Sequence, residues 1–223
     1  LRRRRRLFGV GRGGAPLFCA DPVLEALPRA LLLRALSLLD PLLQEGEAAT
    51  DPKETQRKLV EARDAVELLK TVELQDYFQD DCVAAVREKI RGLDETLTSG
   101  TAVLYPIAFE DRIELLLSLP SGLQRITVPV GRDALVQEVR TFRRYLEKRT
   151  TRQYMRPARQ LYEWLIRPIE QELDAPDIDT LVIVPDAALR TIPMAALHDG
   201  KQFLIHKYAL ASTPSLELTD PRP

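Results

Sequence analysis

The hydrophobic pattern of the chain changes its period at Gly100, and this change constrains the fold more than any other feature. Before Gly100, apolar residues recur every three or four positions, which is the spacing of one face of a helix. After it come three short apolar runs, "TAVLYPIAF", "RIELLLSL" and "LQRITVPV", separated by very short connections. Such runs predict an antiparallel meander. We therefore place a domain boundary near residue 98.

Two helices and a buried strand are expected after the meander. Residues 132–149 and 156–173 each carry apolar side chains on one face, and Pro168 should kink the second helix. Leu181–Val184 is an uninterrupted apolar run, which suits a strand buried on both faces in a parallel sheet. Residues 203–214 predict another pair of extended segments. A mixed α/β sheet is the fold class that this order of elements favours.

Residues 21–98 form the helical part of the chain. Pro28 and Pro41 punctuate its leucine-rich start, which predicts two short buried helices. A longer helix is expected to begin at Pro52, with Asp51 as its N-cap. Its predicted buried face consists of Leu59, Ala62, Val66 and Leu69.

A further helical pattern follows at residues 75–93 and contains Cys82. The four-residue spacing of its apolar side chains places Cys82 in a helix interface. No basic residue nearby in sequence would lower the pKa of its thiol, so we interpret Cys82 as a buried structural residue and not as a nucleophile.

The net charge is −1, so the chain as a whole shows no bias toward nucleic acid. Residues 1–20 nevertheless hold six arginines and no acidic residue. Glycines discourage regular structure there, so we expect a disordered basic tail and confine any binding of nucleic acid to it. The connector at residues 148–156, "KRTTRQYMR", is interpreted as a solvated surface.

The composition also bears on the cellular compartment of the protein and on whether it binds a metal or a cofactor. No run of about 18 apolar residues is present, so no transmembrane helix is expected. Cys19 and Cys82 form neither a metal-ligand pattern nor a CxxC motif, which favours a reduced, cytoplasmic setting without metal or cofactor. The chain begins with Leu1 and ends just after a strand-like run, so we interpret it as a fragment.

No catalytic constellation can be recognised from the residues alone, because P-loop, HExxH and GxSxG motifs are absent. His198 lies in an Asp-Gly turn, where an exposed role is expected, and His206 would pack or face solvent in a strand-like run. Asp186 and Arg190 would lie beyond the carboxyl end of a buried strand, where open α/β sheets place their sites. Both are therefore candidates for a pocket edge. Turn chemistry explains Asp186 equally well, since its carboxylate can accept hydrogen bonds from its own turn.

The segment "LVIVPDAALRTIPMAALHDG", followed by "FLIHKYALASTPS", resembles the start of a CHAT domain, a caspase-like domain associated with TPR repeats. Upstream, "GTAVLYPIAFEDRIELLLSLPSG" resembles the opening hairpin of the family and "YMRPARQLYEWLIRPIEQEL" resembles its helix. "ELQDYFQDDCV" resembles a helical segment that precedes the domain. The resemblance covers residues 71–223. It implies that residues 99–223 are the N-terminal part of a CHAT domain with a caspase-like sheet.

The sequence departs from the family pattern at Ala187 and Ala188, where a glycine and a proline are usual. If the turn needs a positive φ at residue 187, alanine would strain it.

The resemblance implies a cysteine peptidase of the caspase and separase clan, which cuts protein substrates with a paired histidine and cysteine. Neither dyad motif occurs in these residues, so the dyad is expected beyond residue 223 and this chain alone should be inactive. The alternative is a non-catalytic interaction module, in which residues 21–98 dock a regulatory protein partner.

Overall fold

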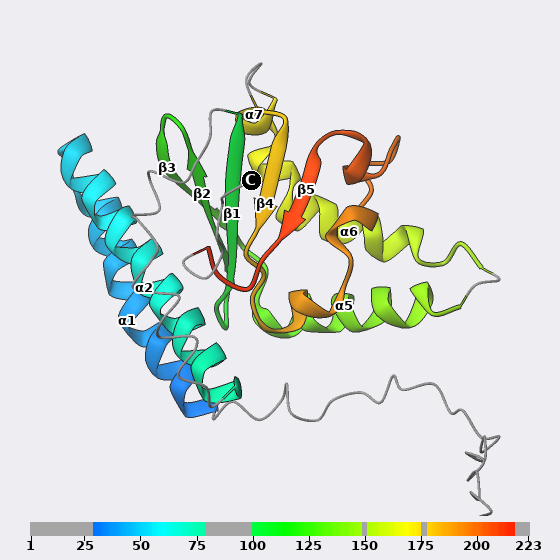
Figure 1. The fold of residues 1–223 in the computed structure, drawn as a ribbon, viewed down its shortest axis with the longest axis horizontal. Coiled ribbons are helices and arrows are strands. Elements are labelled where there is room, and N and C mark those ends of the chain that lie inside the picture. Colours follow the sequence, from blue (N-terminus) through cyan, green and yellow to red (C-terminus); the bar gives the residue numbers. More distant parts are fainter. Residues whose placement is uncertain (1–28, 79–99, 149–150, 175–177, 217–223) are drawn as a thin grey trace, which may run out of the picture.

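The computed structural model describes residues 29–78, 100–148, 151–174 and 178–216. A five-stranded mixed sheet lies between two layers of helices, with α1 and α2 on one face and α5 and α6 on the other (Figure 1). The helices are α1 (Arg29–Ala48), α2 (Pro52–Phe78), α5 (Arg132–Leu146), α6 (Met155–Leu165) and α7 (Glu170–Leu173). The strands are β1 (Thr101–Ala108), β2 (Ile113–Leu119), β3 (Gly122–Val128), β4 (Thr180–Ile183) and β5 (Ala209–Ser212).

The order of the strands in the sheet is β3-β2-β1-β4-β5. β1, β2 and β3 pair antiparallel, which confirms the predicted meander. β4 lies parallel to β1 on one side and to β5 on the other, with Val182 opposite both Val103 and Ala211. The predicted α/β class with a mixed sheet and a buried fourth strand is therefore confirmed.

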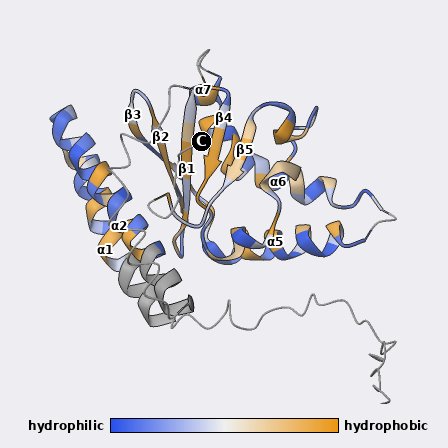
Figure 2. Cartoon of the chain, in the orientation of Figure 1, coloured by the Kyte–Doolittle hydropathy of each residue, from blue (hydrophilic) through white to orange (hydrophobic). Residues whose placement is uncertain are grey.

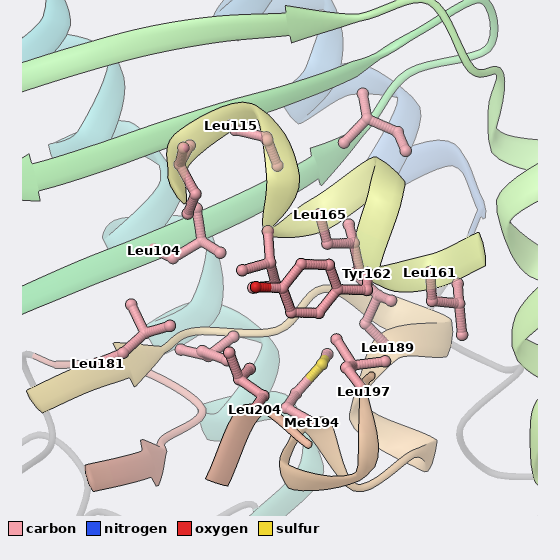
Figure 3. Packing of buried hydrophobic residues seen from close by; sticks show 14 of the residues in the cluster. Leu104, Leu115, Leu161, Tyr162, Leu165, Leu181, Leu189, Met194, Leu197 and Leu204 are labelled. Carbon is pink, nitrogen blue, oxygen red and sulfur yellow. The ribbon is translucent and has the colours of Figure 1, made fainter. Parts of the chain in front are cut away.

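Successive residues of the central strands enter two separate cores, because side chains alternate between the faces of a sheet. On one face, Leu104 and Leu181 pack with Tyr162 and the other buried residues of α5 and α6 (Figure 3). On the other face, Val103 and Tyr105 pack against α1 and α2. Figure 2 shows the resulting hydrophobic strands between helices whose outer surfaces are largely hydrophilic.

The helix α2 begins as predicted. The backbone N–H of Lys53 donates to Oδ1 of Asp51 over 3.0 Å, so Asp51 satisfies one of the free donors of the first turn. Of the predicted buried face, Leu59, Ala62 and Val66 are buried, and Leu69 is half-buried.

The first helix differs from its prediction, because α1 continues through Pro41 as one helix of 20 residues. Pro41 is exposed, while Leu39 and Leu43 beside it are buried against α2 and the sheet. This packing compensates for the hydrogen bond that proline removes, since tertiary contacts supply most of the stability of a helix in a protein.

Two later elements also differ from their predictions. The helix predicted over residues 156–173 ends at Leu165, and a 3₁₀ turn at Arg167–Ile169 contains Pro168 before α7 begins. Pro168 lacks an N–H and obstructs the preceding turn, so the expected kink is a full break. Only one of the two extended segments predicted at residues 203–214 is a strand, because Leu204–His206 forms a 3₁₀ turn ahead of β5.

Several predictions concern residues outside those described, including the basic tail, Cys19 and Cys82. The boundary near residue 98 stays a prediction. Within the described residues, no helix is both long and apolar enough to span a membrane.

A buried carboxylate joins α1 to the sheet. Glu114 on β2 is completely buried and accepts hydrogen bonds from Arg112 over 2.6 Å and from Arg125 over 2.9 Å. Both arginines also reach α1, where Arg112 pairs with Asp40 and Arg125 donates to the carbonyl of Leu43 over 2.7 Å. Burial opposes the charge of Glu114, but the hydrogen bonds from Arg125, Arg112 and Thr127 outweigh it and lower the pKa of this carboxyl.

One edge of the sheet is covered by a side chain. The amide of Gln56 on α2 donates to the carbonyl of Leu123 over 2.8 Å and accepts from its N–H over 3.0 Å. Gly122 makes this approach possible, since a side chain there would lie 3.0 Å from the Gln56 oxygen and would have to adopt a φ of 131°.

We predict that Glu114→Gln lowers the free energy of unfolding by about 3 kcal/mol at pH 7, because it removes the buried counter-charge that two partly buried guanidinium groups share and leaves them only their more exposed carboxylate partners. Urea denaturation monitored by circular dichroism measures the change. Glu54→Gln is the matched control, since Glu54 pairs with Arg57 in an exposed position and should cost under about 1 kcal/mol.

The difference in the free energy of unfolding between the wild type and Glu114→Gln should depend on pH. The folded pKa of Glu114 is lowered, so its stabilisation is present above the unfolded value of about 4.3 and is lost as the pH falls through the folded pKa. The gap between the wild type and Glu114→Gln should therefore narrow below about pH 4. A gap that stays constant down to pH 2 would contradict this assignment.

Candidate site at the carboxyl ends of the parallel strands

The carboxyl ends of β1, β4 and β5 meet at one edge of the sheet, because the three strands are parallel. The turn after β4 and the segment after β5 lie at this edge, and α2 passes over the sheet beside them (Figure 1). In open α/β sheets this edge is where ligands bind.

The turn after β4 is built around Ala187, whose φ is 35°. This left-handed conformation costs an L-residue about 1–2 kcal/mol relative to a right-handed one. The strain expected from the replacement of the usual glycine is therefore present. Arg190 donates from Nε to the carbonyl of Pro185 over 3.2 Å and thereby closes the turn across its base.

The side chain of Asp186 turns away from its own turn and toward α2. Its Oδ1 accepts a hydrogen bond from Nζ of Lys70 over 2.5 Å, and the two side chains are 11% and 3% exposed. Asp186 makes no side-chain cap to the 3₁₀ turn at Ala187–Thr191 that follows it. The carboxylate thus joins the sheet edge to the helical layer. Sequence reasoning missed Lys70, because 116 positions separate the partners.

A second buried contact lies beside this pair. Glu67 on α2 is completely buried and accepts from Oγ of Ser215 over 2.5 Å and from the N–H of Leu216 over 3.1 Å. These bonds hold the segment after β5 against α2. Tyr105 on β1 is also buried, and burial together with the negative charge of Glu67 raises the pKa of its phenol, which stays neutral.

A small cavity of about 30 Å³ lies between α2 and the sheet at this point. Lys70, Tyr105 and Asp186 line it together with apolar side chains. Its size suits about one water molecule and no substrate. Asp186 lines this cavity and Arg190 does not, so a role of either residue at the edge of a substrate pocket stays a prediction.

The described residues show no cysteine–histidine pair. They contain no cysteine, and the hydroxyl of Ser215, which donates to Glu67, is completely buried. Nor does this part of the chain hold a group of three His, Cys, Asp or Glu side chains able to bind a metal ion.

The prediction that His198 is exposed is wrong. His198 is 6% exposed, and its ring lies edge-on to Phe203 with 4.8 Å between the ring centres. A β-bridge between the two residues closes the turn, whose tip at residues 200–202 is exposed, and Nδ1 of His198 accepts from the N–H of Gly200 over 2.9 Å. Burial, and then the positive charge of Arg159, lower the pKa of His198, so the ring is neutral at pH 7. His206 is exposed.

A third polar cluster fastens the segment before β5 to α6 and α7. Lys207 pairs with Glu170 and with Asp199, and the hydroxyl of Tyr162 donates to Glu170 over 2.9 Å. Burial raises the pKa of Tyr162 to about 12. Every one of these groups is satisfied by another, so the cluster holds the fold together and offers no free reactive atom.

Part of this edge of the sheet matches a known protein family. The model of the CHAT domain matches residues 155–223. The C-terminal part of this chain is therefore similar to the CHAT domain. The match begins at α6 and includes β4, the turn with Asp186, and β5. A search of curated proteins found no match. Lys70 and Glu67 lie outside the CHAT segment, so the buried polar contacts connect it to the helical layer that precedes it.

We predict that Ala187→Gly stabilises the protein by about 0.5–1 kcal/mol. Glycine adopts a positive φ without strain, and this gain exceeds the greater backbone entropy of glycine in the unfolded chain. Thermal and urea denaturation measure the effect. Ala188→Gly is the control, because φ there is not positive and the substitution should destabilise by about 0.5–1 kcal/mol. Equal effects of the two substitutions would refute the strain at residue 187.

We also predict strong coupling between Lys70 and Asp186. Lys70→Met or Asp186→Leu alone should cost about 3–5 kcal/mol, because each leaves a buried charge unpaired. The double variant should lie within about 1–2 kcal/mol of the wild type, since an apolar pair can replace a buried ion pair. A double-mutant cycle from urea denaturation measures the coupling, and additive effects would exclude it.

Proposed function

We propose that this chain is the N-terminal part of a CHAT-type cysteine peptidase that cuts protein substrates. The reacting histidine and cysteine would follow strands that come after residue 223. The match of residues 155–223 to the CHAT domain is the observation that carries the proposal.

The arrangement of the sheet supports this placement of the dyad. β5 is at one end of the strand order, and most of its residues are exposed. The backbone groups along such an edge can pair with another strand. A further strand parallel to β5 would end at the same sheet edge as β4, so residues after it would lie near Asp186 and Ser215.

In the proposed reaction, the histidine takes the proton of the cysteine thiol, and the thiolate attacks the carbonyl carbon of the substrate peptide bond. Backbone N–H groups stabilise the oxyanion that forms. When the oxyanion collapses, the peptide C–N bond breaks, the histidine gives its proton to the leaving amine, and water then hydrolyses the thioester to release the acid and the thiol. The described residues would act as positioning groups. Lys70 fixes the turn after β4 through Asp186, and Glu67 fixes the segment after β5 through Ser215, so α2 would determine where the loops of the site lie.

A non-catalytic interaction module with the same fold is the second candidate. The observation that favours it is the closed state of the sheet edge, where α2 leaves a cavity of only about 30 Å³. In this alternative, the helical layer α1–α2 would present a docking surface for a regulatory protein, and the sheet would serve as its support.

The test compares this chain with a protein extended past residue 223 to include the two strands that the proposal expects there. Each is incubated with a mixture of fluorogenic peptides and with a thiol-reactive peptide probe. We expect cleavage and covalent labelling only for the extended protein, and the loss of both when the cysteine after the added strand is replaced by alanine. Cys82→Ala in the extended protein is the matched control and should keep full activity.

Three outcomes would overturn the peptidase proposal. Cleavage by residues 1–223 alone would place the reactive group elsewhere. Activity of the extended protein that survives replacement of the added cysteine would exclude the proposed nucleophile. An extension that folds but neither cleaves nor reacts with the probe would favour the interaction module.

A further inference from the structure

A second basic segment, residues 140–167, has no role in the proposed function. It holds eight arginines and one lysine against two glutamates, in a chain whose net charge is −1. The segment runs from the second half of α5 through the connection and along α6. Figure 1 shows the end of α5 and the start of α6 projecting together from the body of the protein, away from α1 and α2. The positive charge is therefore concentrated on one projecting part of the molecule.

Five of these cations are exposed and make no ion pair with a carboxylate within the described part of the chain. We call this set the basic tip, and it consists of Arg144, Lys148, Arg152, Arg156 and Arg159. The two glutamates of the segment pair with other arginines, Glu147 with Arg143 over 3.5 Å and Glu163 with Arg167 over 3.1 Å. The donors of the basic tip are thus available to an external anion.

Three members of the basic tip, Arg152, Arg156 and Arg159, line an open groove of about 490 Å³. Its other polar lining residues are Gln153, Gln160 and Glu163, and the carboxylate of Glu163 is paired with Arg167. Arg156 and Arg159 are three positions apart and so lie on the same face of α6. Guanidinium groups bind phosphate oxygens with two parallel hydrogen bonds, and contacts of this kind dominate the binding of nucleic-acid backbones.

An aromatic ring lies beside the other two members of the basic tip, Arg144 and Lys148. The guanidinium carbon of Arg144 is 5.3 Å from the ring centre of Tyr145, and Nζ of Lys148 is 5.6 Å from it. Tyr145 is half-buried, so part of its ring stays accessible. Aromatic side chains beside a basic groove are the platforms on which single-stranded bases stack. The charges of the basic tip alone suit an acidic peptide as well, and the ring favours nucleic acid because every base has a face that can stack on it.

We propose that the basic tip binds single-stranded nucleic acid, with the groove arginines on the phosphates and Tyr145 stacked on a base. This revises the interpretation of residues 148–156 as a merely solvated surface. The site lies on α5 and α6, away from the strand-end edge, and it does not depend on the peptidase proposal.

The test uses fluorescence anisotropy with labelled 20-nucleotide single strands of RNA and of DNA, in separate titrations. The protein is residues 1–223 with Arg2–Arg6 and Arg12 replaced by serine, so that the N-terminal arginines do not contribute. We expect binding to both strands, with the logarithm of the affinity falling against the logarithm of the salt concentration with a slope of about −2 for the three phosphate contacts of the groove arginines.

Three variants assign the binding to the basic tip. Arg152→Glu with Arg156→Glu should weaken binding at least about tenfold and make the salt slope shallower. Tyr145→Leu should weaken binding about tenfold without changing the slope, because stacking is not ionic. The matched control is Lys53→Glu with Arg57→Glu, which makes the same change of charge at exposed positions of α2 and should leave the affinity unchanged within about twofold. Circular dichroism melts verify that each variant is folded.

The proposal is overturned if the serine-substituted protein binds neither strand, or if the control variant weakens binding as much as the Arg152 and Arg156 variant. A twenty-residue polyglutamate peptide is titrated in parallel. If it binds as tightly as the oligonucleotides and Tyr145→Leu has no effect, the basic tip is a surface for acidic protein and not for nucleic acid.

Discussion

The parallel pairing of β4 with β1 and β5 is the constraint on which the rest of the structure depends. β1 and β4 are apolar on both faces, so a cover on only one side would leave a core exposed to water. The helices α5 and α6 cover one face, and α1 and α2 cover the other. The N-terminal helices therefore share a core with the sheet, and the CHAT segment at residues 155–223 contributes to only part of that core.

The interface between the sheet and the helices α1 and α2 contains charged groups at the positions where the helices and the sheet must be aligned. Glu114 aligns α1 with β2, while Lys70 and Glu67 align α2 with the segments after β4 and β5. Buried ion pairs add little net stability, because desolvation offsets the attraction between the charges. Their effect is on alignment, since a displaced helix would leave each charge buried without a partner. The edge of the sheet that a peptidase site would use is thus aligned by a helix that lies outside the family match.

Local patterns in the sequence were sufficient to predict the meander, the helix cap at Asp51, the parallel strand and the strained turn at Ala187. Each depends on residues that are close together in the chain. The partnership of Lys70 with Asp186 could not be predicted, because it depends on which helix covers which end of the sheet. The burial of His198 escaped prediction for a similar reason, since a β-bridge to Phe203 closes a turn whose residues are polar. The place of Asp186 after a buried strand follows from the local pattern, whereas its partner on α2 does not.

The two edges of the sheet differ in their capacity to accept another strand. On β3, the amide of Gln56 occupies both backbone groups of Leu123, so an incoming chain would have to displace a side chain that already makes the same two hydrogen bonds. β5 carries no such substitute in the described part of the chain. The sheet can therefore be extended more easily on one side than on the other. Any β-strand added to it, whether from the same polypeptide or from another, would join next to β5.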